Sequence, residues 1–137
     1  MNINDIDKKT DTPICLLTAI FEKQKALHEK YVDIESKKGI LTSAGPVDIN
    51  TCTGQQVLKD FMWRVTEEIG ETANCLKNKP WKQSEILTDE AHYREELIDA
   101  LHFFIELLIL SGFDAQMLYD YYFKKNQVNQ FCQESKY

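Results

Sequence analysis

Carboxylates recur at helical spacing in two segments of the chain. The first segment reads E-E-x-x-E over Glu67, Glu68 and Glu71, and the second reads E-x-x-D over Glu96 and Asp99, with twenty-four residues between them. At about 100° per residue, positions three and four apart in a helix share one face. Two antiparallel helices joined by a short loop would bring these faces together, where the acids repel one another unless cations neutralise them. Hard carboxylate oxygens favour Mg²⁺ or Mn²⁺ over zinc or copper.

Two other interpretations of these acids stay open. Glu67 and Glu71 lie on the side of their helix away from its apolar stripe, where a merely solvated acidic face is common. The second interpretation is a di-iron site in a helix bundle, because Asp99 and His102 form D-x-x-H. Such a site needs two D-x-x-H or E-x-x-H motifs, and the other match in the sequence lies at the start of a helix. Two matched acid motifs on consecutive helices favour the divalent-cation site.

Four segments with helical periodicity must position these acids. They are predicted from Thr12-Pro13 to about Lys38, from a capping box at Thr53 and Gln56 to about Asn78, from Thr88 to Gly112, and from Asp114 toward the C-terminus. Residues 39–53 and 79–88 contain glycine or proline and are predicted to be loops that connect these helices. Repeats and strand alternation are missing from the pattern, so we expect an all-α fold. Residues 1–137 should form a single domain, a bundle of four to five helices.

Apolar residues predict which faces of these helices are buried. In the second segment one stripe is formed by Val57, Leu58, Phe61, Val65, Ile69, Ala73 and Leu76. The third segment is apolar on nearly every side from Leu97 to Leu110, so we expect it to be buried all round, with its acids at the wetter end. His102 is predicted in the core with a hydrogen bond to a neighbouring helix. His28 and His92 are predicted at the surface.

Composition limits the class of protein. The chain has 137 residues, which suit one domain, and its net charge of −6 disfavours nucleic acid as a partner. The most apolar stretch is too short and too charged to span a membrane. The four cysteines form no C-x-x-C, and the N-terminal residues contain no apolar signal segment. We therefore expect reduced thiols and a cytoplasmic protein.

Four blocks of the sequence share a pattern with a known family. They are LLTAIFEKQKALHEKY (16–31), EEIGETANCLKNKPW (67–81), EELIDALHFFIELLILSGF (95–113) and YYFKKNQVNQFCQ (121–133). Together they resemble the all-α nucleoside triphosphate pyrophosphohydrolases. Either acid motif alone also occurs in the broader MazG-like group, whereas the first and fourth blocks resemble the dimeric dUTPase and phage dCTPase-dUTPase branch.

The resemblance implies Mg²⁺-dependent conversion of dUTP to dUMP and pyrophosphate, with dCTP as an alternative or additional substrate. In the family, the positions matching Glu68, Glu71, Glu96 and Asp99 hold Mg²⁺, which binds the triphosphate and activates a water. Glu71 is the favoured base for that water, with Glu67 as the alternative. Substrate binding is assigned to Gln24 for the base and to Asn74, Lys77, Trp81, Lys125 and Asn129. A homodimer is also implied, in the host cytoplasm if a phage encodes it.

Two departures from the family pattern affect the expected substrate contacts. Cys132 stands where the family usually has a phosphate-binding arginine, so that contact is lost or supplied by Lys124 or Lys136. His28 stands where Asp or Asn usually follows the leucine, which leaves the choice between uracil and cytosine open. Two other functions remain as alternatives, a MazG-like hydrolase with purine or broad preference and a non-catalytic helical dimer or interaction protein.

Overall fold

The computed structural model describes residues 15–135, which contain four helices and no strand. These are α1 (Leu16–Lys37), α2 (Cys52–Asn74), α3 (Glu90–Leu110) and α4 (Ala115–Glu134). The predicted all-α fold is confirmed. The predicted start of the first helix, at Thr12-Pro13, lies outside the described residues.

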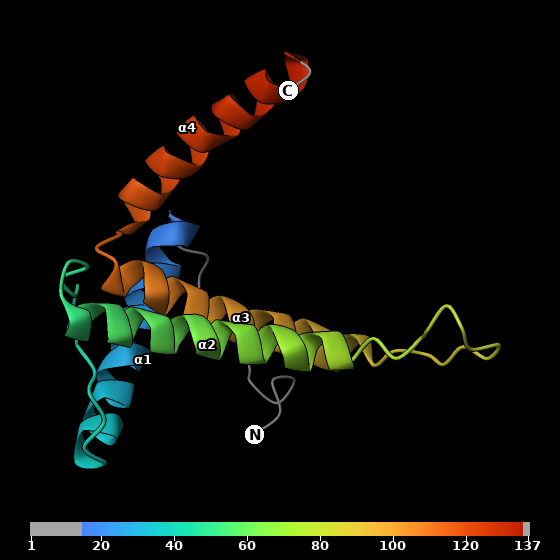
Figure 1. The fold of residues 1–137 in the computed structure, drawn as a ribbon, viewed down its shortest axis with the longest axis horizontal. Coiled ribbons are helices and arrows are strands. Elements are labelled where there is room, and N and C mark those ends of the chain that lie inside the picture. Colours follow the sequence, from blue (N-terminus) through green and yellow to red (C-terminus); the bar gives the residue numbers. More distant parts are fainter. Residues whose placement is uncertain (1–14, 136–137) are drawn as a thin grey trace.

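The α2–α3 pair forms the body of the molecule. The two helices run antiparallel and side by side, and α1 crosses them near the end where α2 begins (Figure 1). After α3, the chain turns at Gly112, whose φ of 89° lies in the left-handed region that favours glycine. Helix α4 then projects away from the α2–α3 pair (Figure 1). The acid motifs thus lie on the paired helices.

Apolar packing is concentrated at the end of the pair that α1 crosses. One cluster joins Val57, Leu58 and Phe61 of α2 to Leu110 of α3, and a second joins Phe21 of α1 to Ile105 and Ile109 of α3. Farther along the predicted stripe, Ile69 of α2 and Leu76, which follows the end of that helix, are exposed. The stripe is therefore buried only in its first half.

The prediction that the third helix is buried all round is wrong. Leu97, Ile98, Leu101 and Phe104 are exposed on α3, whereas Ala100, Ile105, Ile109 and Leu110 are buried. Helices α1 and α2 pack against α3, and no residue of α4 is buried. One side of α3 is consequently uncovered within residues 15–135.

Polar side chains cap three of the helices. Asp114 caps α4 as predicted, with its carboxylate accepting from the Met117 N–H. Helix α2 is capped by Thr51 instead of Thr53, and α3 by Asp89 instead of Thr88. The capping box predicted at Thr53 is therefore wrong by two residues, and α2 ends at Asn74, before the predicted Asn78.

Candidate active site

Three carboxylates from the two acid motifs meet between α2 and α3. Glu68 of α2 and Glu96 and Asp99 of α3 each offer one oxygen atom, and these atoms lie within 4.8 Å of one another. Glu68 and Glu96 are partly buried, while Asp99 is exposed. The structure thus brings together three of the five acids that the sequence singled out. Glu67 and Glu71 are exposed on α2 and lie outside this acid cluster.

Charge repulsion is evident within the acid cluster. Burial raises the pKa of Glu68, and the negative charges of Glu71, Asp99, Glu96 and Glu67 raise it further. A cation would relieve this repulsion. Octahedral Mg²⁺ with bonds of about 2.1 Å places its ligand oxygens up to about 4.2 Å apart. Among three such oxygens at most one pair can lie on opposite sides of the ion, and adjacent ones lie about 3 Å apart. The clustered carboxylate oxygens, which lie within 4.8 Å of one another, would therefore draw closer together to hold Mg²⁺ or Mn²⁺.

The acid cluster contains carboxylates alone, which does not suit the di-iron interpretation. His102 of the D-x-x-H motif is partly buried, and its Nδ1 lies 2.8 Å from the carbonyl of Ile98, one turn back in the same helix. The prediction that His102 bonds to a neighbouring helix is therefore wrong.

A pocket of about 420 Å³ lies beside the acid cluster, where the chain leaves α2 and enters α3. Its lining residues include Glu71, Asn74, Lys77, Ile86, Leu87, Thr88, Asp89 and His92. Three of these, Glu71, Asn74 and Lys77, are among the predicted site residues. His92 links the pocket to the cluster, because its Nδ1 lies 3.5 Å from the Glu96 Oε1. Sequence analysis did not assign His92 to the site, although its spacing of four from Glu96 placed both on one helix face.

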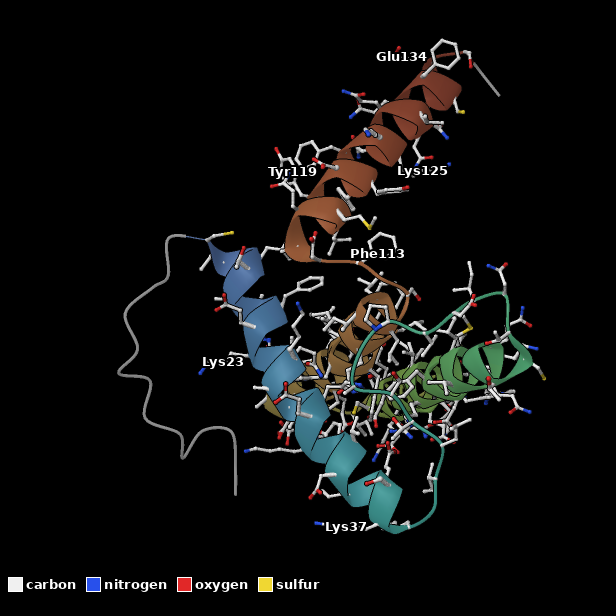
Figure 2. All side chains as sticks on the ribbon, turned by 90° about the vertical axis from the view of Figure 1, so that its left-hand side faces the viewer. Lys23, Lys37, Phe113, Tyr119, Lys125 and Glu134 are labelled. Carbon is white, nitrogen blue, oxygen red and sulfur yellow. The ribbon has the colours of Figure 1, made fainter. Side chains whose placement is uncertain are left out.

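The remaining predicted site residues lie elsewhere. Trp81 is 77% exposed in the loop between α2 and α3, with the Lys79 ammonium 6.0 Å from its ring centre. Lys125 and Asn129 are exposed on α4, and Figure 2 shows Lys125 on the part of that helix that stands away from α2 and α3. Lys124 is on α4 as well, and Lys136 lies outside the described residues.

Gln24 and His28 belong to a buried polar network between α1 and α3. Gln24 is 3% exposed, His28 1% and Glu106 0%. The Gln24 Nε2 donates to the Glu106 Oε1 at 2.6 Å, and the His28 Nδ1 lies 3.4 Å from the Glu106 Oε2. The prediction of His28 at the surface is wrong, because positions 21, 24 and 28 share the inward face of α1.

His28 is held between two acceptors. Its Nε2 lies 2.5 Å from the carbonyl oxygen of Ser43, in the loop between α1 and α2, while its Nδ1 faces Glu106. A carbonyl and a carboxylate both accept, so both ring nitrogens donate only when the ring is an imidazolium. The Glu106 carboxylate beside Nδ1 accordingly raises the pKa of His28 against the opposing effect of burial.

The fold and site define an all-α protein with a cluster of carboxylates, the ligand type that divalent cations such as Mg²⁺ prefer. The sequence profile described as dUTPase matches residues 16–111, a range that contains α1, α2, α3 and the acid cluster. The chain belongs to this dUTPase family. The fourth block of the resemblance, on α4, lies outside the matched range. No curated protein and no solved structure matches the chain. None of the four described helices is long and apolar enough to cross a membrane.

Proposed function

We propose that the chain is a Mg²⁺-dependent pyrophosphohydrolase that converts dUTP to dUMP and pyrophosphate, with dCTP as an alternative or additional substrate. The observation that carries this proposal is the acid cluster beside a pocket of mixed polar and apolar lining in a chain of the dUTPase family. The pocket volume of about 420 Å³ falls within the range of small-molecule sites. Without cations the acids would repel a polyphosphate, so the metal requirement follows from the charge of the site.

In this proposal Glu68, Glu96 and Asp99 hold the metal, and Glu71 completes the set from the pocket side. Bound Mg²⁺ would supply charge neutralisation at the triphosphate and a lowered pKa for water. Glu71 accepts the proton of the water that attacks the α-phosphorus, because its carboxylate lines the pocket and is exposed. Glu67, the alternative base, is a neighbour of Glu68 outside the pocket lining.

Substrate contacts are proposed both from the pocket and from residues outside it. The Lys77 ammonium and the Asn74 amide line it and would offset or bind phosphate oxygens. Gln24 remains the proposed base-recognition residue, with its amide nitrogen oriented by Glu106. Trp81 would pack on the nucleoside from the exposed loop. Lys125 and Asn129 would contact the triphosphate only if α4 moves toward the pocket or if the α4 of a second copy of the chain reaches it.

We also propose a homodimer, in which a second copy covers the exposed apolar side chains of α3 and α4. On α4 these include Tyr119, Tyr121, Tyr122, Phe123 and Phe131, each more than half exposed. A fully buried aromatic side chain covers about 150–250 Å², so five rings that are each a little over half exposed offer several hundred Å² of apolar surface to a second copy. Light scattering should give about twice the chain mass of 16.0 kDa. A monomer at every concentration up to the millimolar range would contradict the proposal.

The activity is tested with a panel of nucleoside triphosphates in Mg²⁺, with EDTA as the control. We expect monophosphate and pyrophosphate from dUTP, alone or together with dCTP, and no reaction in EDTA. Hydrolysis of purine nucleotides to the same extent would favour the MazG-like alternative. If no pyrimidine deoxynucleotide is cleaved, and Mg²⁺ with a non-hydrolysable dUTP analogue leaves the Tm unchanged, the non-catalytic interpretation replaces this one.

A further inference from the structure

One asparagine ties the end of α2 to the chain that returns to α3. The Asn78 Nδ2 donates to the carbonyl of Ile86 at 3.0 Å, and the Ile86 N–H donates to the Asn78 Oδ1 at 2.8 Å. A single side-chain amide thus satisfies both backbone groups of one residue, as a neighbouring strand would. We call this pair of hydrogen bonds the Asn78 clasp. It closes residues 79–85 into a loop.

Packing does little to hold this loop in place. Trp81 is 77% and Leu87 101% exposed, and Ile86 is more than half exposed. The Lys82 N–H donates to the Lys79 carbonyl, a turn that stays within the loop. Because little apolar surface is buried here, the position of Ile86 relative to α2 depends on the clasp.

The clasp sets the geometry of the pocket. Residues 86–88 form one part of the pocket wall, and Glu71, Asn74 and Lys77 form another. Asn78 lies one residue beyond Lys77, so it joins residues 86–88 to the segment that leaves α2, where the proposed substrate-binding residues Asn74 and Lys77 lie. A change in the clasp would therefore alter the width of the pocket.

We propose that Asn78 is a positioning residue for the substrate pocket. It acts through Ile86 by holding residues 86–88 at the separation from α2 that lets Asn74 and Lys77 contact the polyphosphate. This role rests on the proposed function, whereas the clasp itself does not. An amide is required because it both donates and accepts, while alanine does neither and a carboxylate only accepts.

The clasp is tested by hydrogen exchange at the Ile86 amide in protein free of metal and nucleotide. We expect protection in the wild type and exchange at least tenfold faster in Asn78→Ala. Asn78→Asp keeps an acceptor for the Ile86 N–H and should restore part of the protection. Asn126→Ala is the matched control, since Asn126 is an exposed asparagine of α4 whose side chain accepts from Gln130 in its own helix. An unprotected Ile86 amide in the wild type would overturn the clasp.

The positioning role is tested by kinetics of the same variants with dUTP and Mg²⁺. Asn78→Ala should raise KM about tenfold and leave kcat within about threefold, with partial rescue by Asn78→Asp and no change in Asn126→Ala. An unchanged KM despite lost protection, or a fall in kcat alone, would overturn the positioning role. An inactive wild type would overturn the proposed function and with it this role, while the exchange result would still decide the clasp.

Discussion

Asp99→Asn should abolish hydrolysis of dUTP, lowering kcat/KM by about a thousandfold or more while the helical circular dichroism signal stays near that of the wild type. Asp99 contributes one of the three clustered oxygens, and it is exposed, so the fold does not depend on its charge. Loss of a metal ligand removes charge stabilisation of several kcal/mol, and about 1.4 kcal/mol corresponds to a factor of ten in rate. Steady-state kinetics with dUTP and Mg²⁺ measures the loss.

A second readout of the same variant does not depend on activity. The charge of Asp99 helps to raise the pKa of Glu68, so removing that charge should relieve repulsion and raise the Tm of the metal-free protein. The increase in Tm that Mg²⁺ produces in the wild type should then be reduced or lost. Asp120→Asn on α4 is the control, because this exposed carboxylate lies outside the acid cluster. An Asp99→Asn protein that keeps full activity and the full Mg²⁺ response would remove Asp99 from the site.

The paired acid motifs were predictable because helical spacing alone places Glu96 and Asp99 on one face, and Glu68 lies on the facing helix. Which glutamate of α2 belongs to the acid cluster could not be predicted. Glu67 and Glu68 are adjacent, and only the rotation of α2 against α3 decides which of them points inward. Sequence periodicity fixes that rotation to within about one residue, or about 100°.

The pocket wall and the buried network escaped prediction for a different reason. Asn78 and Ile86 are eight residues apart in a connection without periodicity, so neither their residue types nor their spacing predicts the two hydrogen bonds between them. The inward face of α1 carries Gln24 and His28, and His28 was predicted at the surface because polar side chains are usually exposed. Glu106 gives both a buried partner, and only the packed structure shows that pairing.

Glu106→Gln should have the largest effect on stability among the polar residues, lowering the free energy of unfolding by about 3 kcal/mol at pH 6. The variant keeps the size of the side chain and an acceptor for Gln24, but it leaves the buried imidazolium of His28 without its opposite charge. Breaking one partner of a buried ion pair typically costs about 3–5 kcal/mol. Urea unfolding of both proteins measures the difference.

The pH dependence of this difference identifies its origin. The pKa of His28 in the folded protein is raised above its ordinary value of 6.5, so the pair stabilises the fold fully below about pH 6.5, and this contribution is lost as the pH rises through the folded pKa. The gap between the wild type and Glu106→Gln should therefore narrow as the pH rises. Glu90→Gln, in an ion pair with Arg94 that is 74% exposed on the same helix, should change stability by less than about 1 kcal/mol at each pH. A gap that stays constant from pH 5.5 to 8.5 would mean that His28 is already neutral in the folded protein, with one ring nitrogen facing an acceptor to which it cannot donate.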